Sequence, residues 1–223
     1  MEQMRRFMAD AAHELRTPVT ILRTRTELAL AQPRDATGDT AAFQAIEREA
    51  DRLGGIVGDL LTLARADAGE RQVVRASLYL DDVVSQVVAA ARALAERKGV
   101  ALVVGSFEEA QISGDAGLVE RLVLIVLDNA IKYTPPGGRV VVEVGRQNGR
   151  ASLRVQDSGP GIPSDELPRI WERLFRGDRS RAERGLGLGL SLVKAVVEAH
   201  AGQVSAVSSV GQGSTFIVSL PSA

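Results

Sequence analysis

The sequence predicts two units: an antiparallel pair of long helices that dimerises into a four-helix bundle, followed by an α/β sandwich. Two observations carry this prediction. Apolar residues keep heptad spacing up to about residue 67. From about residue 73 onward, helical periods mix with strand-like alternation. We therefore expect a helical unit over residues 1–67, a linker over 68–72 and a second unit over 73–223.

Two apolar seams define the helical unit. The first alternates steps of three and four along Met4, Met8, Ala11, Leu15, Val19, Leu22, Thr26 and Ala29. The second does the same along Phe43, Ile46, Ala50, Leu53, Val57, Leu60 and Ala64. The segment 32–40 (QPRDATGDT) suits a turn between the helices. One hairpin cannot bury such a seam, so the pairing of two hairpins predicts a homodimer. An intramolecular coiled-coil arm is the alternative, and it leaves more apolar surface in water.

The first helix contains His13, one of only two histidines in the chain, and then Pro18. The ring of Pro18 clashes with the carbonyl of Glu14 and provides no N–H donor, so a kink is predicted beside His13. Because His13 lies off the apolar seam, its ring should point outward. A lone histidine is most often a solvated surface residue, and only the motifs downstream argue against that here. The second histidine, His200, is predicted to cap or pack a helix end.

The elements of the second unit follow from hydrophobic periodicity. Helices are expected at 80–97, 115–133 and 188–200, and strands at 100–104, 139–145, 151–156, 203–208 and 214–220. Asn148-Gly149 is a strong signal for a two-residue β-hairpin turn. Helices packed on one face of a mixed sheet form an α/β sandwich.

The composition of the 223 residues excludes several classes of protein. There is no cysteine, hence no disulfide framework or thiolate metal site. The longest strongly apolar stretch, 122–127, is far too short to span a bilayer, and no signal-peptide pattern is present. The 27 basic residues are dispersed and the net charge is −1, so nucleic-acid binding is not expected. These features are typical of an intracellular chain.

Two polar motifs in the second unit suit a nucleotide. Residues 128–134 (DNAIKYT) end a predicted helix: Asn129 offers an oxygen to a hard cation, Lys132 a point charge to phosphate and Tyr133 an aromatic face to a base. Residues 157–161 (DSGPG) follow a predicted strand, where the carboxylate of Asp157 can accept the amino group of adenine. Each motif alone is also common at the end of an ordinary helix or in an ordinary turn.

Two glycine-rich segments complete the set. Residues 185–189 (GLGLG) open a helix, where free backbone N–H groups and the helix dipole favour phosphate. This is not a Rossmann fingerprint, because no strand precedes it and the spacing differs. Residues 211–216 (GQGSTF) form a turn into the last strand, which on its own is most simply structural.

With the aromatic segment 170–176 (IWERLFR), the order of these motifs resembles the GHKL (Bergerat) ATP-binding fold. Histidine kinases, type II topoisomerases, Hsp90 and MutL proteins share that fold. Upstream, residues 13–18 (HELRTP) resemble the phosphoacceptor box of sensor histidine kinases, which narrows the resemblance to that family over nearly the whole chain. The resemblance implies binding of ATP and Mg²⁺, autophosphorylation on histidine, and transfer to an aspartate of a response regulator.

The resemblance also assigns roles in the helical unit. His13 is expected to be the phosphoacceptor, and Glu14 the carboxylate that orients or deprotonates it. Thr17 is expected to support phosphatase action on the regulator. The implied partners are a second copy of the chain and the receiver domain of a response regulator.

In the second unit, the resemblance assigns the nucleotide contacts position by position. Asn129 is expected to bind the metal, and Lys132 and Tyr133 to contact phosphate and nucleoside. Asp157, with Gly159 and Gly161, is expected to recognise adenine. Phosphate contacts are expected beside Gly185, Gly187 and Gly189, and a nucleotide contact is expected from Thr215. Residues 163–184 are expected to form a mobile lid.

Three positions depart from the family pattern. Ile125 stands where the family often has a second Asn, so metal organisation should rest more heavily on Asn129 and Asp128. Ser158 and Arg184 each stand where relatives often have another residue, Asn and Gly respectively. None of these changes removes a group that the chemistry requires.

The heptad spacing of the first helix already includes Met4. We therefore expect the cytoplasmic portion of an inner-membrane-anchored bacterial receptor, with the membrane reached only through upstream segments. A naturally short soluble kinase is one alternative. Others are an ATP-driven conformational machine without histidine transfer and a non-catalytic dimeric scaffold or phosphatase, which Ile125 mildly favours. The sequence leaves open whether phosphorylation runs within or between subunits.

Overall fold

The computed structural model describes residues 2–31, 36–67, 74–177 and 187–223, without the side chains of residues 2–14, 36–39, 52 and 67. Backbone contacts divide the chain into a helical unit that ends at residue 68 and an α/β unit that follows it. The division falls beside the predicted linker. Among the described helices, none has the length and apolar character needed to cross a membrane.

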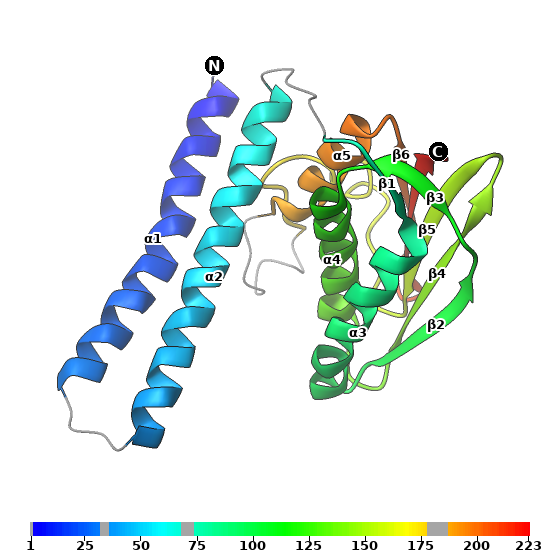
Figure 1. Ribbon diagram of the computed structural model, residues 1–223. Helices are drawn as coiled ribbons and strands as arrows, with labels where there is room; N and C mark the ends of the chain where they lie inside the picture. The colour runs from blue at the N-terminus through cyan, green and yellow to red at the C-terminus, as the bar shows by residue number, and fades with distance from the viewer. Residues whose placement is uncertain (1, 32–35, 68–73, 178–186) are drawn as a thin grey trace. The chain divides into compact units, whose positions relative to one another are not determined.

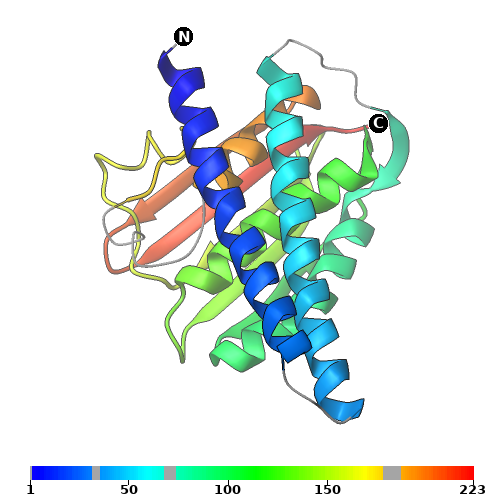
Figure 2. The same ribbon diagram turned by 90° about the vertical axis from the view of Figure 1, so that its left-hand side faces the viewer.

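The helical unit is a hairpin of two long helices, α1 (Glu2–Ala31) and α2 (Ala36–Asp67), which lie side by side (Figures 1 and 2). α1 runs through Pro18 without a break in the helix, and the side chain of Pro18 is buried. The predicted helices are therefore confirmed, whereas a kink beside His13 stays a prediction.

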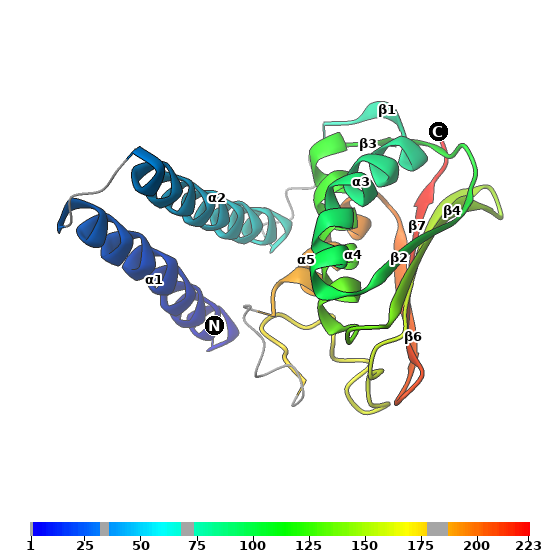
Figure 3. The ribbon, with the colours of Figure 1, turned by 90° about the horizontal axis from the view of Figure 1, so that it is seen from below.

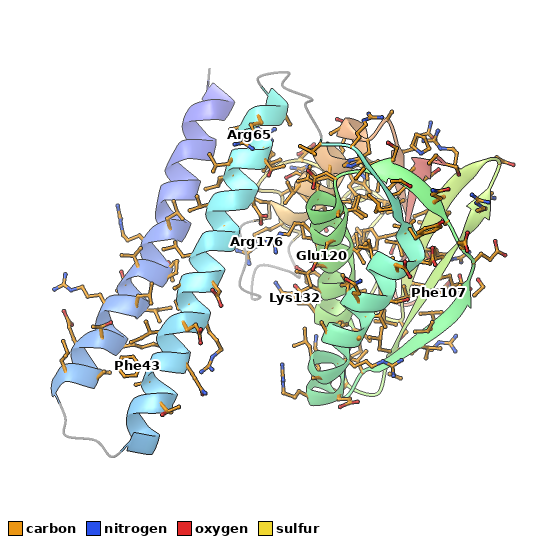
Figure 4. All side chains as sticks on the ribbon, viewed as in Figure 1. Phe43, Arg65, Phe107, Glu120, Lys132 and Arg176 are labelled. Atoms are coloured by element: carbon orange, nitrogen blue, oxygen red, sulfur yellow. The ribbon has the colours of Figure 1, made fainter. Side chains whose placement is uncertain are left out.

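The hairpin leaves much of its apolar surface exposed. Leu30 is 83% exposed and Phe43, labelled in Figure 4, is 67% exposed. Among the described side chains of this unit, Leu63 is the only large apolar one that is fully buried. One copy of the hairpin therefore has no complete core. This agrees with the prediction that two copies pair to bury these side chains.

The α/β unit contains a five-stranded mixed sheet in the order β2-β4-β5-β7-β6. Its strands are β2 (Ala101–Phe107), β4 (Arg139–Gln147), β5 (Arg150–Asp157), β6 (Gln203–Ser209) and β7 (Gly213–Pro221). β2 and β4 are parallel and the other pairs are antiparallel. In the β4–β5 turn, Asn148 and Gly149 both have positive φ, 54° and 72°, as the predicted two-residue hairpin requires.

Helices α3 (Leu80–Lys98), α4 (Ala116–Tyr133) and α5 (Gly189–Ala199) cover one face of the sheet (Figures 1 and 3). The core lies between these layers, because alternate strand residues point toward the helices. Buried examples are Val142 of β4, Val155 of β5 and Val218 of β7. The opposite face is more polar and carries the Arg154–Glu143 ion pair at 3.6 Å. The predicted α/β sandwich is confirmed.

Two short strands were missed by the sequence analysis: β1 (Ala76–Tyr79) and β3 (Gln111–Gly114), which pair antiparallel. Four residues are too few to show a convincing alternation, and the partners are more than thirty residues apart in the chain. The pair is extended by the backbone N–H of Leu80, which donates to the carbonyl of Ala110 at 2.9 Å.

His200 joins the end of α5 to the start of α4. Its Nδ1 lies 2.8 Å from the carbonyl oxygen of Val196, and its Nε2 accepts the backbone N–H of Asp115 at 3.0 Å. These two contacts place the proton on Nδ1. The ring is only 2% exposed, so the predicted packing role is confirmed.

Candidate functional site

The polar motifs of the α/β unit meet where α4 ends and α5 begins. A Cβ placed on Gly189, the first residue of α5, would lie 3.0 Å from Cγ2 of Ile125 and 3.9 Å from Nδ2 of Asn129. A Cβ on Gly159 would lie 2.9 Å from the carbonyl oxygen of Tyr133. The DNAIKYT, DSGPG and GLGLG segments are therefore neighbours in space, as the sequence analysis requires.

The last turn of α4 carries Asn129, Lys132 and Tyr133. Asn129 and Lys132 are half-buried, and Lys132 Nζ lies 5.3 Å from the centroid of the Tyr133 ring. The apolar face of α4 is buried in the core, so the polar residues at its C-terminal end are fixed in position relative to the sheet.

A lysine from another helix holds the end of α4. Lys98, the last residue of α3, donates from Nζ to the carbonyl oxygens of Ile131, at 2.9 Å, and of Lys132. Thr134, which is fully buried, donates from Oγ1 to the carbonyl of Ala130 at 2.7 Å. The bonds from Lys98 satisfy carbonyls that a helix C-terminus otherwise leaves without partners, and the cation matches the helix dipole.

Asp128 is the carboxylate beside Asn129 on the same helix. Burial of its carboxyl by surrounding protein raises its pKa, and the positive charges of Lys132, Arg121 and Lys98 oppose that rise. The side chain is nonetheless exposed to solvent overall. Asp128 and Asn129 thus offer two adjacent oxygen-bearing groups at the end of α4.

Asp157 ends β5 and is the buried acid of the site, with only 5% exposure. Its Oδ1 accepts the backbone N–H of Gly159 at 2.8 Å and of Ser214 at 3.2 Å. Burial raises the pKa of the Asp157 carboxyl, while the two N–H donors and the hydroxyl of Ser214 lower it. The carboxyl is fixed by these donors, so it can serve as a positioned acceptor for a donor on a ligand.

Two glycine-containing backbone segments pack closely against their neighbours beside Asp157. Gly161 has φ +71°, and a Cβ there would clash with the carbonyl of Ser209, the last residue of β6. Gly213 has φ +88°, and a Cβ there would clash with the carbonyl of Asp157. Both the backbone conformation and the close approach therefore require glycine.

The start of α5 has two features that favour an anion. Within the described residues, its N-cap residue, Leu188, forms no side-chain capping bond, and the first turn carries no acidic residue. The first backbone N–H groups of a helix without a side-chain cap can bind phosphate oxygens. Gly187 has φ +67° and its carbonyl accepts the N–H of Leu174 at 3.0 Å. Gly185 lies outside the described residues.

The aromatic segment packs beside the last strand. Trp171 contacts Phe216 of β7 edge-to-face, with ring centroids 6.3 Å apart, and the Arg169 guanidinium lies 4.6 Å from the centroid of Phe175. A polar cavity of about 410 Å³ is present here. Its lining residues are Asp165, Glu166, Arg169, Glu172, Arg173, Leu174, Phe175 and Arg176. Of the predicted lid, residues 178–184 lie outside the described residues.

The hydroxyl beside Asp157 belongs to Ser214, which the sequence analysis did not single out, and a nucleotide contact by Thr215 stays a prediction. In the β5–β7 register Ser214 pairs with Asp157, whereas Thr215 pairs with Gln156. Paired residues share a sheet face and successive residues alternate, so Thr215 lies on the face away from Asp157. Strand register could not be known from the sequence, although the small polar residue directly after Gly213 was a usable signal.

The residues predicted for phosphoacceptance lie in α1, in the helical unit. His13 and Glu14 belong to the helix, but their side chains are outside the described part of the chain. The side chain of Thr17 is exposed. Thr17 follows His13 by four positions in the helix, which places both on one helix face.

The residues of the α/β unit fit a magnesium nucleotide. Among the described side chains, no group of three or more His, Cys, Asp or Glu residues could enclose a metal ion. Mg²⁺ does not need such a cage, because it usually keeps waters and binds through one or two protein oxygens plus substrate phosphates. Asn129, next to the start of α5, and the adjacent Asp128 of α4 match that donor set.

Fold and site together define a nucleotide-binding α/β domain joined to a helical hairpin. The family model of the histidine kinase-, DNA gyrase B- and HSP90-like ATPase matches residues 114–223. The model of the His Kinase A (phospho-acceptor) domain matches residues 3–69. Both models describe domains named for histidine kinases, and the first also covers DNA gyrase B- and HSP90-like ATPases.

Named relatives agree with the family models. The chain is 39% identical to sensor histidine kinase CusS of Escherichia coli O157:H7, over 96% of this chain and 45% of the relative. It is also 39% identical to the signal transduction histidine-protein kinase/phosphatase MprB of Mycobacterium avium strain 104, over 99% of this chain and 43% of the relative. A solved structure of a mycobacterial sensor histidine kinase MprB superimposes with a TM-score of 0.59 at 34% identity, covering 66% of this chain and 97% of that one.

The chain belongs to the sensor histidine kinase family. It spans less than half the length of the two sequence relatives named above.

Proposed function

We propose that this chain is the catalytic core of a sensor histidine kinase, which phosphorylates His13 with ATP and passes the phosphoryl group to an aspartate of a response regulator. The observation that carries the proposal is the convergence of Asp157, Asn129 and the uncapped start of α5 in one site. The match of residues 3–69 to a phosphoacceptor domain supplies the second half of the reaction.

Each group in the α/β unit has a chemical task in this proposal. Asp157 accepts the exocyclic amino group of adenine, and Tyr133 provides an aromatic face beside it. Lys132 and the N–H groups at the start of α5 neutralise phosphate charge. Gly159, Gly161, Gly187 and Gly189 let the backbone approach the nucleotide, and Gly185 has the same expected role.

Asn129, with Asp128 beside it, would hold Mg²⁺ together with the phosphates. When bound, the ion would neutralise charge on the triphosphate. The chain itself contributes the two side-chain oxygen donors and the rigid end of α4 that carries them.

The transfer step uses residues of α1. A ring nitrogen of neutral His13 attacks the γ-phosphorus, the bond from phosphorus to the β–γ bridging oxygen breaks, and ADP leaves. Glu14 accepts the proton from the other ring nitrogen as the N–P bond forms. A histidine with an ordinary pKa of about 6.5 is largely neutral at pH 7, so no large shift is required.

The proposed partners are a second copy of the chain and a receiver domain. Exposed apolar side chains on α1 and α2, such as Leu30 and Phe43, support the dimer. For the receiver domain, the support is family membership. We further propose that this core acts in the cytoplasm, where ATP is available; anchoring to the inner membrane stays a prediction.

Phosphatase activity toward the regulator is proposed for Thr17. One of the relatives, MprB, carries the name kinase/phosphatase. A hydroxyl on the same helix face as His13 could orient a water against a phosphoaspartate. Thr17→Ala should slow regulator dephosphorylation with autophosphorylation retained, and Thr17→Val should do the same if the hydroxyl is responsible.

Incubation with γ-labelled ATP tests the kinase function. The chain should acquire label that is lost in acid and stable in base, as phosphohistidine is. His13→Gln should remove all label and still bind ATP within about threefold of the parent, an affinity difference of less than 1 kcal/mol. ATP binding without label in the parent would instead identify a non-catalytic scaffold, and label retained by His13→Gln would exclude His13.

A further inference from the structure

Three segments around Asp157 meet at one hydroxyl, that of Ser208 in β6. The backbone N–H of Ile162, next to the DSGPG loop, donates to Ser208 Oγ at 2.8 Å. Ser208 Oγ donates to the carbonyl of Gly213 at 2.8 Å and lies 3.0 Å from Oγ of Ser214. The same side chain thus ties the loop after Asp157 to the β6–β7 turn.

This hydroxyl has a partner for its proton and for at least one of its lone pairs. A serine hydroxyl has one proton and two lone pairs. Ser208 gives its proton to Gly213, accepts the N–H of Ile162, and has one lone pair left for the proton of Ser214. The Ser214 proton therefore has two acceptors within reach, Ser208 and the carboxyl of Asp157.

We infer that Ser208 is a positioning residue for adenine recognition, which holds Ser214 and Ile162 so that the carboxyl of Asp157 points at the amino group of the base. This inference rests on the proposed nucleotide function of the site. Ser214 contacts Asp157 twice, through its backbone N–H and its hydroxyl, so displacement of Ser214 displaces the acceptor.

The consequence is specificity between bases. Adenine presents an amino donor at its 6-position, where guanine presents a carbonyl acceptor. A rigidly held carboxylate accepts a hydrogen bond from the amino group of adenine and gains no such bond from the carbonyl of guanine. If Asp157 loses its fixed orientation, the affinity for ATP falls because this hydrogen bond is weakened. The affinity for GTP changes little, because GTP does not form the bond.

A merely structural role for Ser208 predicts a different result. Loss of three hydrogen bonds would then lower the stability of the fold and weaken both nucleotides alike. The ratio of ATP to GTP affinity, measured on folded protein, separates the two roles.

The experiment uses the full 223-residue chain and non-hydrolysable ATP and GTP analogues with Mg²⁺, measured by calorimetry. Ser208→Ala should bind the ATP analogue about tenfold more weakly, the size expected for one displaced hydrogen bond to a charged group. The GTP analogue should change by no more than about twofold, so the preference for ATP also falls about tenfold.

Two further variants make the result specific. Ser205→Ala removes a hydroxyl from the same strand on the other sheet face, where it is exposed, and should keep the parent's preference. Ser208→Cys nearly preserves the shape but weakens both donor and acceptor, so it should show an intermediate preference. If circular dichroism shows that Ser208→Ala is unfolded, Ser208→Cys tests the inference in its place.

The outcomes are distinct. A parent chain with no preference for ATP over GTP overturns adenine recognition by Asp157, and the inference with it. A parent that prefers ATP, together with folded Ser208 variants that keep the same ratio or weaken both nucleotides equally, overturns the role of Ser208 alone.

Discussion

The helical unit and the α/β unit bury their apolar residues in different ways. In the α/β unit, a sheet and three helices enclose a continuous core in which Leu122, Leu153 and Leu192 are each no more than 1% exposed. In the described part of the helical unit, Leu63 is the only large apolar side chain that is fully buried. The comparison indicates that the α/β unit closes its own core, whereas the hairpin requires a second surface.

This difference matches the proposed division of chemistry between the units. A nucleotide site needs acceptors held within a fraction of an ångström, and the closed core around Asp157 and α4 provides that rigidity. A phosphoacceptor must be reached by two different partners in turn, the nucleotide site and a receiver domain. A surface helix of an open hairpin suits that second task.

The largest expected effect comes from separating the units. Residues 73–223 should be a folded monomer that binds ATP, because their core is complete. Residues 1–67 should be a dimer, because one hairpin leaves Leu30 and Phe43 in water. Sedimentation equilibrium gives both masses, and nucleotide calorimetry tests the larger fragment.

A matched change sharpens this prediction within the hairpin. Phe43→Ser should shift the fragment of residues 1–67 toward monomer, whereas Thr40→Ser, at an exposed polar position three residues earlier, should leave the mass unchanged. A monomeric parent fragment would contradict the proposed bundle and favour the intramolecular arm.

The second prediction separates two contacts within the nucleotide site. Asp157→Ala should lose the preference for ATP over GTP, whereas Asn129→Ala should keep that preference and lose the dependence of binding on Mg²⁺. Each loss should be about tenfold to a hundredfold in affinity, as expected for hydrogen bonds to charged groups. Titrations of ATP and GTP with and without Mg²⁺ measure both effects.

Equal losses of ATP and GTP affinity in Asp157→Ala would show that the carboxyl supports the fold without recognising the base. A third variant, Gln156→Ala, serves as the control. It lies next to Asp157 on the other sheet face and should bind both nucleotides as the parent does.

The sequence predicted elements that are long and periodic, and it failed where a role depends on distant partners. Helices α3 and α4 and the β4–β5 hairpin were predicted to within about two residues of their observed ends. Ser214 was not singled out beside Asp157, because strand register decides which of two neighbouring residues faces that carboxyl. Lys98 and Ser208 were not singled out at all. Lys98 bonds a carbonyl 33 residues away and Ser208 accepts an N–H from 46 residues away, and no local pattern records such contacts.

Lys98 supplies the third prediction. Lys98→Met should destabilise the fold by about 1–2 kcal/mol, because two carbonyls at the end of α4 lose a charged donor. ATP affinity should fall by about threefold to tenfold, because Asn129, Lys132 and Tyr133 sit on the turn that Lys98 holds. Denaturant unfolding and calorimetry measure the two effects.

Two controls define the cause. Lys98→Arg keeps the charge and should recover most of the affinity. Lys194→Met removes an exposed lysine of α5 whose closest carboxylate, that of Glu198, is 4.0 Å away, and it should change neither quantity. If Lys98→Met binds ATP as the parent does, the end of α4 does not depend on this lysine.

The smallest effect concerns the stability of the α/β unit as a function of pH. Burial raises the pKa of Asp157, so the folded protein holds that proton more tightly than the unfolded chain, in which the pKa of Asp is about 3.9. Ionisation of Asp157 therefore opposes folding as the pH rises through the folded-state pKa. Asp157→Asn stays neutral at every pH, and its side-chain oxygen can still accept the N–H groups of Gly159 and Ser214.

Thermal unfolding of Asp157→Asn and of the parent should therefore agree below pH about 3.9, where both states of the parent carry the proton. At neutral pH the Asn variant should unfold at the higher temperature, by a small margin, because the donors from Gly159 and Ser214 offset part of the cost of the buried charge. Asp165→Asn, at an exposed carboxyl, is the control and should show no such gap. A less stable Asn variant at neutral pH would mean that the ionised carboxyl stabilises the fold. A more stable variant that has lost its preference for ATP would show that this buried charge is kept for recognition of the base and at the expense of stability.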